Sequence, residues 1–278
     1  MAFEIDSAVF DLDDTLLHDD LTVSDYTVRV LQELHKAGVR IIIASGRAQQ
    51  SMKPYVEQMA CVSAYISCNG AEIWEGLSHR CICRELLPVD TCVEIACFAE
   101  RHGCYAHTYD KGCFFYNSAG KYAAIYATAT KLKGVHVGKL SSFIREPRNK
   151  ILMIDDDEKI ASMYQEAQKL FRGRASVTCS KPCYLEFNPP GASKGNALQT
   201  LSHYLDFDLK RTIAFGDSLN DLSMFQQTGI SVIVSNGWKE VRNCCDDVCG
   251  SNNQDGPAHY LDTCFLHGGC LFDLSQGF

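Results

Sequence analysis

The stretch that decides the fold is Ala8-Val9-Phe10-Asp11-Leu12-Asp13-Asp14-Thr15-Leu16-Leu17. Its apolar start is typical of a short strand that is buried on both faces of a parallel sheet. Such a strand delivers Asp11 to its carboxyl end, the edge at which open α/β sheets bind ligands. Side chains two apart in an extended chain point the same way, so Asp11 and Asp13 are expected to face one pocket. Carboxylates this close repel each other unless a cation lies between them. We therefore interpret the stretch as a site rather than as a solvated acidic loop.

The composition of the 278-residue chain is that of an ordinary globular protein, with 46% hydrophobic and 22% charged residues. This length is long for one compact core, so one large domain with a smaller insertion is expected. The formal charge of −8 argues against binding to nucleic acid or to an anionic membrane. No secretory leader is predicted, because Glu4 and Asp6 interrupt the first residues, and no apolar run reaches membrane-spanning length. A cytoplasmic location is expected, and a monomer.

The fifteen cysteines are many for such a chain. Without an export signal they are expected to be free thiols, often buried as small hydrophobic groups. The tight cysteine clusters lack the paired spacing and the histidines of a structural zinc site, so no zinc is predicted. These clusters are Cys81-Ile82-Cys83 and the group Cys244, Cys245 and Cys249.

Strands and helices alternate in the first and last parts of the chain, which predicts right-handed crossovers and a parallel sheet. Ser24 is expected to cap a helix to about residue 37 with Val28, Leu31 and Leu34 on its buried face. A second helix is expected through about residue 59, with Pro54 in its first turn or at a kink. Further strands are predicted over residues 39–44, 65–68, 212–216 and 230–234, and further helices from residues 194, 238 and 257.

The pattern changes between about residues 86 and 185, where hairpins mixed with helices predict an antiparallel sheet covered by helices. Lys111-Gly112 is the expected turn of one hairpin. The acidic run 155–158 is interpreted as helix capping and dipole compensation rather than as a metal site. Strands are predicted over residues 104–110, 113–117, 150–154, 175–179 and 183–187, and helices over residues 89–102, 118–132 and 157–171. We expect a core of residues 1–84 and 187–278, with residues 85–186 inserted into it.

Polar residues follow several of the predicted core strands, namely Asp11 and Asp13, then Ser45, then Asp217, and Lys194 begins a helix in the same half. The carboxyl ends of parallel strands line one edge of a sheet, so these side chains are expected to converge. Taken singly, Ser45 is equally well explained as a helix cap and Lys194 as a solvated residue of a first helical turn. Taken jointly and in order, those explanations are poor.

Four segments in order resemble the four motifs of the haloacid dehalogenase superfamily of phosphatases. They are Asp11-Leu12-Asp13-Asp14-Thr15, Ser45-Gly46-Arg47, Lys194-Gly195 and Gly216-Asp217-Ser218-Leu219-Asn220-Asp221. The layout is most similar to the Cof-type branch, whose inserted type IIB cap lies between the second and third motifs. The segments Asn69-Gly70-Ala71, Pro190-Gly191-Ala192-Ser193-Lys194-Gly195 and Asp255-Gly256 also match that branch.

The resemblance spans nearly the whole chain and implies an α/β fold, with a Rossmann-like parallel-sheet core and an inserted α+β cap domain. Two positions depart from the common pattern. Asp14 stands where many relatives have glycine, and Ser218 stands where glycine is frequent. Relatives carry both variations, so the implied catalysis is unaffected.

The resemblance further implies a Mg²⁺-dependent phosphatase that hydrolyses small phosphomonoesters, such as sugar phosphates or related metabolites, through an aspartyl-phosphate. Asp11 is then the nucleophile and a metal ligand, Asp13 the acid and base and a ligand through its backbone carbonyl, and Asp217 the second metal carboxylate. A raised pKa would suit the role of Asp13. The implied phosphate-binding residues are Ser45, Lys194, Asn69 and Asn220, and the implied supporting residues are Gly46, Arg47 and Asp221.

Two other functions stay open at this point. One is a phosphotransferase or mutase of the phosphomannomutase type, and the other is a non-catalytic ligand-binding protein with the same fold. Within the insertion, His107, Tyr109 and Tyr184 are core or surface residues by default, although one or two of them are candidates for substrate contact.

Overall fold

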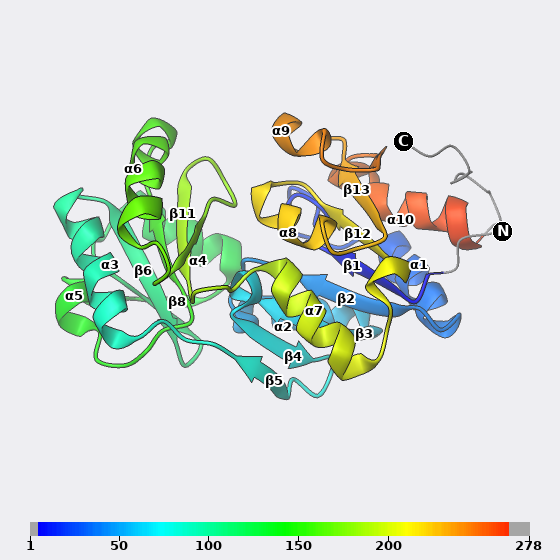
Figure 1. Ribbon diagram of the computed structural model, residues 1–278, viewed down its shortest axis with the longest axis horizontal. Coiled ribbons are helices and arrows are strands. Elements are labelled where there is room, and N and C mark those ends of the chain that lie inside the picture. The colour runs from blue at the N-terminus through cyan, green and yellow to red at the C-terminus, as the bar shows by residue number, and fades with distance from the viewer. Residues whose placement is uncertain (1–4, 267–278) are drawn as a thin grey trace.

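The computed structural model describes residues 5–266 and has two lobes, each built on its own sheet (Figure 1). The first sheet has the strand order β14-β13-β12-β1-β2-β3-β4-β5, and the second has the order β10-β11-β9-β6-β7-β8. We call the first lobe the core and the second the cap. Both the first and the last parts of the chain build the core, and the middle of the chain, green in Figure 1, builds the cap. The predicted α/β fold with an inserted α+β cap domain is thereby confirmed.

The core sheet is parallel through six of its strands. These are β1 (Ser7–Phe10), β2 (Arg40–Ala44), β3 (Val62–Ser67), β12 (Thr212–Gly216), β13 (Ile230–Val234) and β14 (Asp247–Cys249). Two antiparallel strands that the sequence pattern did not predict, β4 (Glu72–Glu75) and β5 (Cys81–Arg84), extend the β3 edge toward the cap. The central strand β1 is buried along its whole length, as its apolar sequence predicted.

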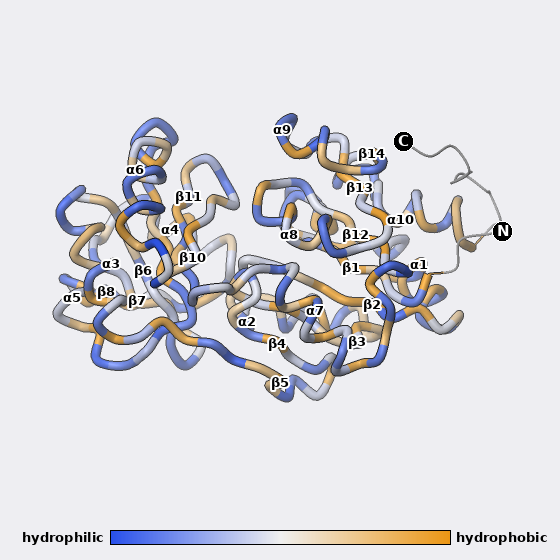
Figure 2. The backbone as a smooth tube through the Cα atoms, viewed as in Figure 1, coloured by the Kyte–Doolittle hydropathy of each residue, from blue (hydrophilic) through white to orange (hydrophobic). Residues whose placement is uncertain are grey.

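Helices cover both faces of the core sheet, because successive side chains of its strands point to opposite faces. Phe10 of β1 packs in one cluster with residues of α1 (Asp25–Lys36), α2 (Gln49–Met59) and α10 (Gly256–Leu261). Its neighbour Val9 packs in the other cluster with residues of α7 (Lys194–Leu205), α8 (Leu222–Phe225) and α9 (Lys239–Arg242). Figure 2 shows that the residues along these central strands are hydrophobic.

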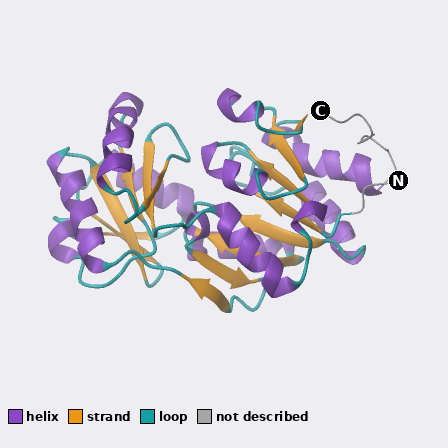
Figure 3. Ribbon diagram, in the orientation of Figure 1, coloured by secondary structure: helices purple, strands orange, loops and turns teal. Residues whose placement is uncertain are grey.

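The cap sheet carries helices on both faces (Figure 3). Its strands are β6 (Tyr105–Asp110), β7 (Cys113–Tyr116), β8 (Lys133–His136), β9 (Ile151–Ile154), β10 (Ser176–Thr178) and β11 (Tyr184–Asn188). On β9, Ile151 and Met153 pack against α3 (Val89–Arg101), α5 (Leu140–Phe143) and α6 (Asp157–Leu170). Leu152 and Ile154 face the opposite way and pack with α4 (Lys121–Thr130) and with core residues. The second face of the cap therefore lies against the core.

Several local predictions were wrong. On α1, Val30 joins Leu31 and Leu34 on the buried face and Val28 is only partly buried against the same cluster. Pro54 lies in the interior of α2, so the first of its two predicted places, the first turn, is wrong. The cap sheet is mixed rather than antiparallel, because β8, a strand that was not predicted, runs parallel to β7. The acidic residues at the start of α6 compensate its dipole, but the N-cap Asp156 makes no side-chain cap hydrogen bond. Over residues 5–266, no helix has both the length and the apolar character needed to span a membrane.

Candidate active site

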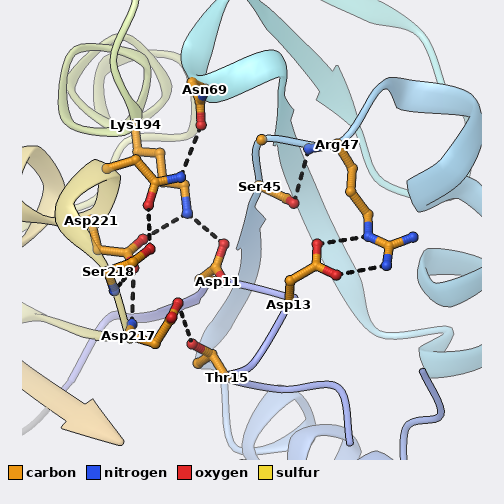
Figure 4. Close-up of polar contacts among 12 residues, drawn as sticks. Asp11, Asp13, Thr15, Ser45, Arg47, Asn69, Lys194, Asp217, Ser218 and Asp221 are labelled. Atoms are coloured by element: carbon orange, nitrogen blue, oxygen red, sulfur yellow. Dashed lines mark hydrogen bonds and ion pairs between the residues drawn. The ribbon is translucent and has the colours of Figure 1, made fainter. Parts of the chain in front are cut away.

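The predicted site residues converge at the carboxyl edge of the core sheet, which faces the cap (Figure 4). Asp11 follows β1 directly, Ser45 follows β2, and Asp217 follows β12. Lys194 is the first residue of α7, whose N-cap Ser193 accepts a hydrogen bond from the Asn196 backbone N–H. The sheet topology brings together residues that lie more than 200 positions apart, and this convergence was expected from parallel strands alone.

Lys194 holds two buried carboxylates together. Its side chain is fully buried, and Nζ donates to Asp11 Oδ1 at 2.5 Å and to Asp221 Oδ1 at 2.6 Å. The alternative of a solvated first-turn residue is therefore wrong. Burial and the charges of Asp221 and Asp13 raise the pKa of Asp11 to about 8, against the opposing effect of Lys194. The carboxylate of Asp11 thus lies in a site that favours more positive charge than Lys194 alone supplies.

Asp217 lies on the other side of Asp11 and has little compensation for its charge. It is only 6% exposed, and the Thr15 hydroxyl reaches its Oδ1 at 3.5 Å. Burial, together with the charges of Asp11 and Asp221, raises the pKa of Asp217 well above its ordinary value. Carboxylate oxygens of these three residues lie within 4.8 Å of one another. A site of buried, mutually repelling carboxylates fits a hard divalent cation.

The candidate cation cluster differs in part from the predicted ligand set. Asp11 and Asp217 belong to both, but the third carboxylate of the cluster is Asp221. Both oxygens of Asp221 are already engaged, since Oδ1 accepts from Lys194 and Oδ2 accepts from the backbone N–H groups of Asp217 and Ser218. Asp221 is thus both a cap for the turn after β12 and an anchor for Lys194.

Asp13 is turned away from this cluster and is held by Arg47. Arg47 Nε and Nη2 donate to the two carboxylate oxygens of Asp13 at 2.8 and 2.7 Å, as Figure 4 shows. Burial acts to raise the pKa of Asp13, but the charge and the paired hydrogen bonds of Arg47 outweigh it and lower the pKa. In this arrangement the pKa of Asp13 is thus lowered, whereas a raised pKa would suit the implied acid and base role. The cause is Arg47, whose contact could not be inferred from spacing.

The turn after β2 places Ser45 and Gly46 beside Asp11. Ser45 is buried, and its Oγ accepts from the Arg47 backbone N–H at 3.1 Å, while α2 begins only after Ala48. Ser45 is therefore not the cap of that helix, as the alternative interpretation had it. Its hydroxyl lines the pocket together with Gly46 and Arg47.

Asn69 and Asn220 lie next to this turn and bond to each other. Asn69 has a left-handed backbone, with φ of 54°, and its Oδ1 accepts from Asn220 Nδ2 at 3.0 Å. Asn69 Nδ2 donates to Glu186 of the cap at 2.7 Å. Asn220 lines the pocket beside Asp217, whereas Asn69 does not line it. The structure thus brings both predicted asparagines to the site, with Asn69 behind Asn220.

Residues of the cap line one side of the pocket, which has a volume of about 100 Å³. This is well below the roughly 300–1,000 Å³ of pockets that enclose a small-molecule ligand. Among the suggested aromatic residues, Tyr184 lines the pocket, and His107 and Tyr109 are buried in the cap. No sequence signal pointed to the remaining lining residues of the cap, because they follow no motif. They include Tyr126, Thr130, Lys150, Leu152, Lys181 and Glu186.

Comparison with known proteins agrees with this geometry. A sequence profile of the haloacid dehalogenase-like hydrolases matches residues 8–261. The chain belongs to the haloacid dehalogenase-like hydrolase family. The crystal structure of a haloacid dehalogenase-like hydrolase from Bacteroides thetaiotaomicron is similar, with a TM-score of 0.84 and 25% identity over 94% of this chain and 100% of that one.

Curated relatives in this family are phosphatases by name. The 5-amino-6-(5-phospho-D-ribitylamino)uracil phosphatase YcsE of Bacillus subtilis is 26% identical over 92% of this chain and 94% of its own. The HMP-PP phosphatase of Yersinia pseudotuberculosis is 27% identical over 91% of this chain and 93% of its own. The predicted family, its Cof-type branch and the prediction of a phosphatase enzyme are confirmed. The roles of the individual site residues stay predictions.

Proposed function

We propose that this phosphatase hydrolyses small phosphomonoesters, such as sugar phosphates or related metabolites, in a Mg²⁺-dependent reaction through an aspartyl-phosphate. The observation that carries the proposal is the environment of Asp11. Its carboxylate is buried at the closed end of the pocket, against the ammonium of Lys194 and beside Asp217. A carboxylate with a fixed cation on one side and room on the other is suited to attack a phosphoryl group.

The residues present fit a magnesium ion. Asp11 and Asp217 would hold it with their carboxylates, and Asp13 would add its backbone carbonyl. When bound, the ion supplies positive charge that offsets the repulsion between Asp11 and the phosphoryl oxygens. The raised pKa values of Asp11 and Asp217 support this assignment, because a raised pKa means that too little positive charge lies near the carboxylate.

In the first step, an oxygen of Asp11 forms a bond to phosphorus as the bond to the ester oxygen breaks. Asp13 donates its proton to the departing alkoxide. In the second step, Asp13 takes a proton from water, whose oxygen attacks phosphorus and releases Asp11 and inorganic phosphate. Lys194 and Ser45 hold the phosphoryl oxygens, where charge gathers in a loose transition state. Asn220 adds a further contact, with Asn69 behind it.

The contact between Arg47 and Asp13 has to change during this cycle. As long as both hydrogen bonds are made, Asp13 is a carboxylate and has no proton to donate. An arriving phosphate ester brings negative charge next to Asp13, and like charges raise the pKa of a carboxyl group. Phosphate also competes for the guanidinium of Arg47, which binds it in the same paired geometry. Substrate binding thereby prepares Asp13 as the acid.

We propose that residues 85–186 form the cap and move to admit the substrate, because the pocket in this arrangement is too small to enclose one. A substrate of metabolite size is supported by the relatives, whose names describe phosphatases of 5-amino-6-(5-phospho-D-ribitylamino)uracil and of HMP-PP. Action in the cytoplasm as a monomer is part of the proposal.

The test is a screen for phosphate release from phosphosugars, nucleotides and cofactor phosphates, with and without MgCl₂. We expect turnover that requires the metal and is lost on chelation. Asp11→Asn should abolish turnover of a generic aryl phosphate while the protein stays folded. Near-normal turnover by this variant would show that Asp11 is not the nucleophile, and a folded wild type inactive on the whole panel would contradict the proposed function.

A further inference from the structure

A charged pair lies buried where the cap meets the core, outside the motifs discussed so far. Lys150 immediately precedes the cap strand β9, and Glu186 lies on its neighbour β11, opposite Leu152. Both side chains are 2% exposed and are bonded to each other. Side chains along a strand alternate between faces, so Lys150 shares the core-facing side of β9 with Leu152 and Ile154. The pair therefore points at the core.

Each member of the pair contacts a different part of the predicted phosphate site. Lys150 Nζ donates to the backbone carbonyl of Gly46 at 2.8 Å, within the turn that carries Ser45. Glu186 Oε2 accepts from Asn69 Nδ2 at 2.7 Å, and Asn69 in turn accepts from Asn220 at 3.0 Å. Two sets of hydrogen bonds thus connect the cap to the core, one reaching the turn after β2 and the other reaching the turn after β12.

The space around the Gly46 turn leaves little freedom for these contacts to slip. A Cβ added at Gly46 would lie 3.0 Å from Asn69 Oδ1 and 3.5 Å from Glu186 Oε1. The turn, the asparagine and the cap carboxylate are therefore packed directly against one another. Because no gap separates these groups, a shift of Glu186 or Lys150 is expected to displace the turn at Gly46.

A contribution to the stability of the fold does not explain well why this charged pair is buried here. Burying two charges costs desolvation free energy that their attraction does not reliably return, and apolar residues of similar size are often as stable or more so. Leu152 and Ile154 show that the same strand face accommodates apolar side chains. A charged pair at this place is better explained by what its hydrogen bonds hold in position.

We infer that Lys150 and Glu186 are positioning residues that complete the phosphate subsite when the cap lies on the core. Lys150 fixes the carbonyl of Gly46 and with it the Ser45 hydroxyl, and Glu186 fixes Asn69 and with it the Asn220 amide. Because both belong to the cap side and their partners belong to the core, the contacts exist only with the cap docked. The inference rests on the proposed function, in that it takes the pocket to bind phosphate.

The test removes both charges together, since removing one leaves the other buried without a partner. Lys150→Met with Glu186→Leu is expected to melt within a few degrees of the wild type, because apolar pairs substitute well at such sites. It should bind inorganic phosphate at least 10-fold more weakly by calorimetry in the presence of MgCl₂. It should also lose about 10- to 100-fold in kcat/KM, since small misplacements in a site cost up to about 10²-fold.

The matched control is another charged pair of the inserted cap. Arg148 Nη1 lies 3.4 Å from Asp110 Oδ2, and neither residue lines the candidate active site. Arg148→Met with Asp110→Asn should leave phosphate binding and kcat/KM within twofold. A second variant, Lys150→Gln with Glu186→Met, offers one amide that can donate to Gly46 and accept from Asn69. It should recover phosphate affinity to within about threefold of the wild type.

A folded apolar variant that binds phosphate within twofold of the wild type would overturn the inference. So would an equal loss in the Arg148 and Asp110 control, because that loss would be a general effect of charge removal. If the apolar variant does not fold, the folded amide variant decides: retained affinity supports the inference, and a loss above 10-fold overturns it. The binding measurement needs no turnover, so an inactive wild type would contradict the proposed phosphatase without deciding this question.

Discussion

Replacing Lys194 with methionine tests how far the site depends on the buried ammonium beside Asp11. Lys194 bonds to Asp11 and to Asp221 at 2.5 and 2.6 Å, and its side chain has no solvent exposure. Removing one partner of a buried ion pair costs about 3–5 kcal/mol, because the other charge stays buried. At roughly 2–4 °C per kcal/mol, the variant should melt about 10 °C lower than the wild type.

The loss of activity should exceed what instability explains. Lys194 contacts the oxygen of Asp11 next to the expected position of the phosphoryl group, and removing one such donor costs about 10²–10³-fold in kcat. The assay is steady-state hydrolysis of an aryl phosphate with MgCl₂, at a temperature where circular dichroism shows the variant folded. Lys159→Met is the control, since Lys159 pairs with Asp155 at 2.7 Å on the cap surface. It should change neither quantity measurably.

A double variant separates charge balance from phosphate binding. Lys194→Met with Asp221→Asn removes the carboxylate that the lysine would otherwise leave unpaired, so part of the melting temperature should return. The activity should stay low, because nothing replaces the ammonium beside Asp11. Recovery to within about fivefold of the wild-type kcat/KM would refute the reasoning, since Lys194 would then serve only to neutralise Asp221.

Three further predictions follow from single contacts. Burial, and secondarily the charge of Lys150, lowers the pKa of His107 well below 6.5. As the pH falls below 6.5, His107 becomes protonated in the unfolded chain but stays neutral in the folded protein. The free energy of unfolding should therefore fall by about 1.4 kcal/mol per pH unit. Urea denaturation at several pH values should show that the free energy of unfolding depends less on pH in His107→Phe than in the wild type. Asp14 and Lys181 form a half-exposed ion pair at 3.2 Å between core and cap, so a double-mutant cycle on kcat/KM should give a coupling below about fivefold. Arg47→Gln should raise the pKa of Asp13 and shift the alkaline limb of the pH–kcat/KM profile upward, and an unmoved limb would contradict Asp13 as the acid.

The core was predictable because its pattern is local. A buried strand such as β1 is apolar along its length, and its end is marked by the first polar residue, so Asp11, Ser45 and Asp217 were placed correctly at one edge. The strands β4 and β5 were missed because each is only 4 residues long and follows no clear alternation, although β4 is largely buried and β5 is partly exposed. The strand β8 contains Gly134, against which Phe114 packs so closely that a Cβ would lie 2.6 Å away. Glycine is a weak strand former, so only that packing accounts for the strand.

The hydrogen bonds and pKa shifts within the site were less predictable than the identity of its residues. Motif spacing brings Asp13 and Arg47 to one edge, but it does not say that they bond to each other and lower the pKa of Asp13. Nor does it reveal Lys150 and Glu186, which lie in the insertion and follow no motif. Charges and hydrogen bonds between distant segments depend on distances of a few tenths of an ångström. Sequence periodicity carries no information at that scale.

The cap meets the catalytic turns through polar contacts that depend on its position. Arg47 donates to the carbonyl of Ala129 at the end of α4 as well as to Asp13, Lys181 reaches Asp14, and Lys150 reaches Gly46. Hydrogen bonds lose most of their strength over about one ångström, so each contact ends when the cap lifts. Opening of the cap would therefore remove the hydrogen bond from Arg47 to the Ala129 carbonyl, and Arg47 is the residue that lowers the pKa of Asp13. In the proposed mechanism, substrate entry and the protonation of Asp13 are therefore linked through Arg47, and the cap takes part in the chemistry as well as in the exclusion of water.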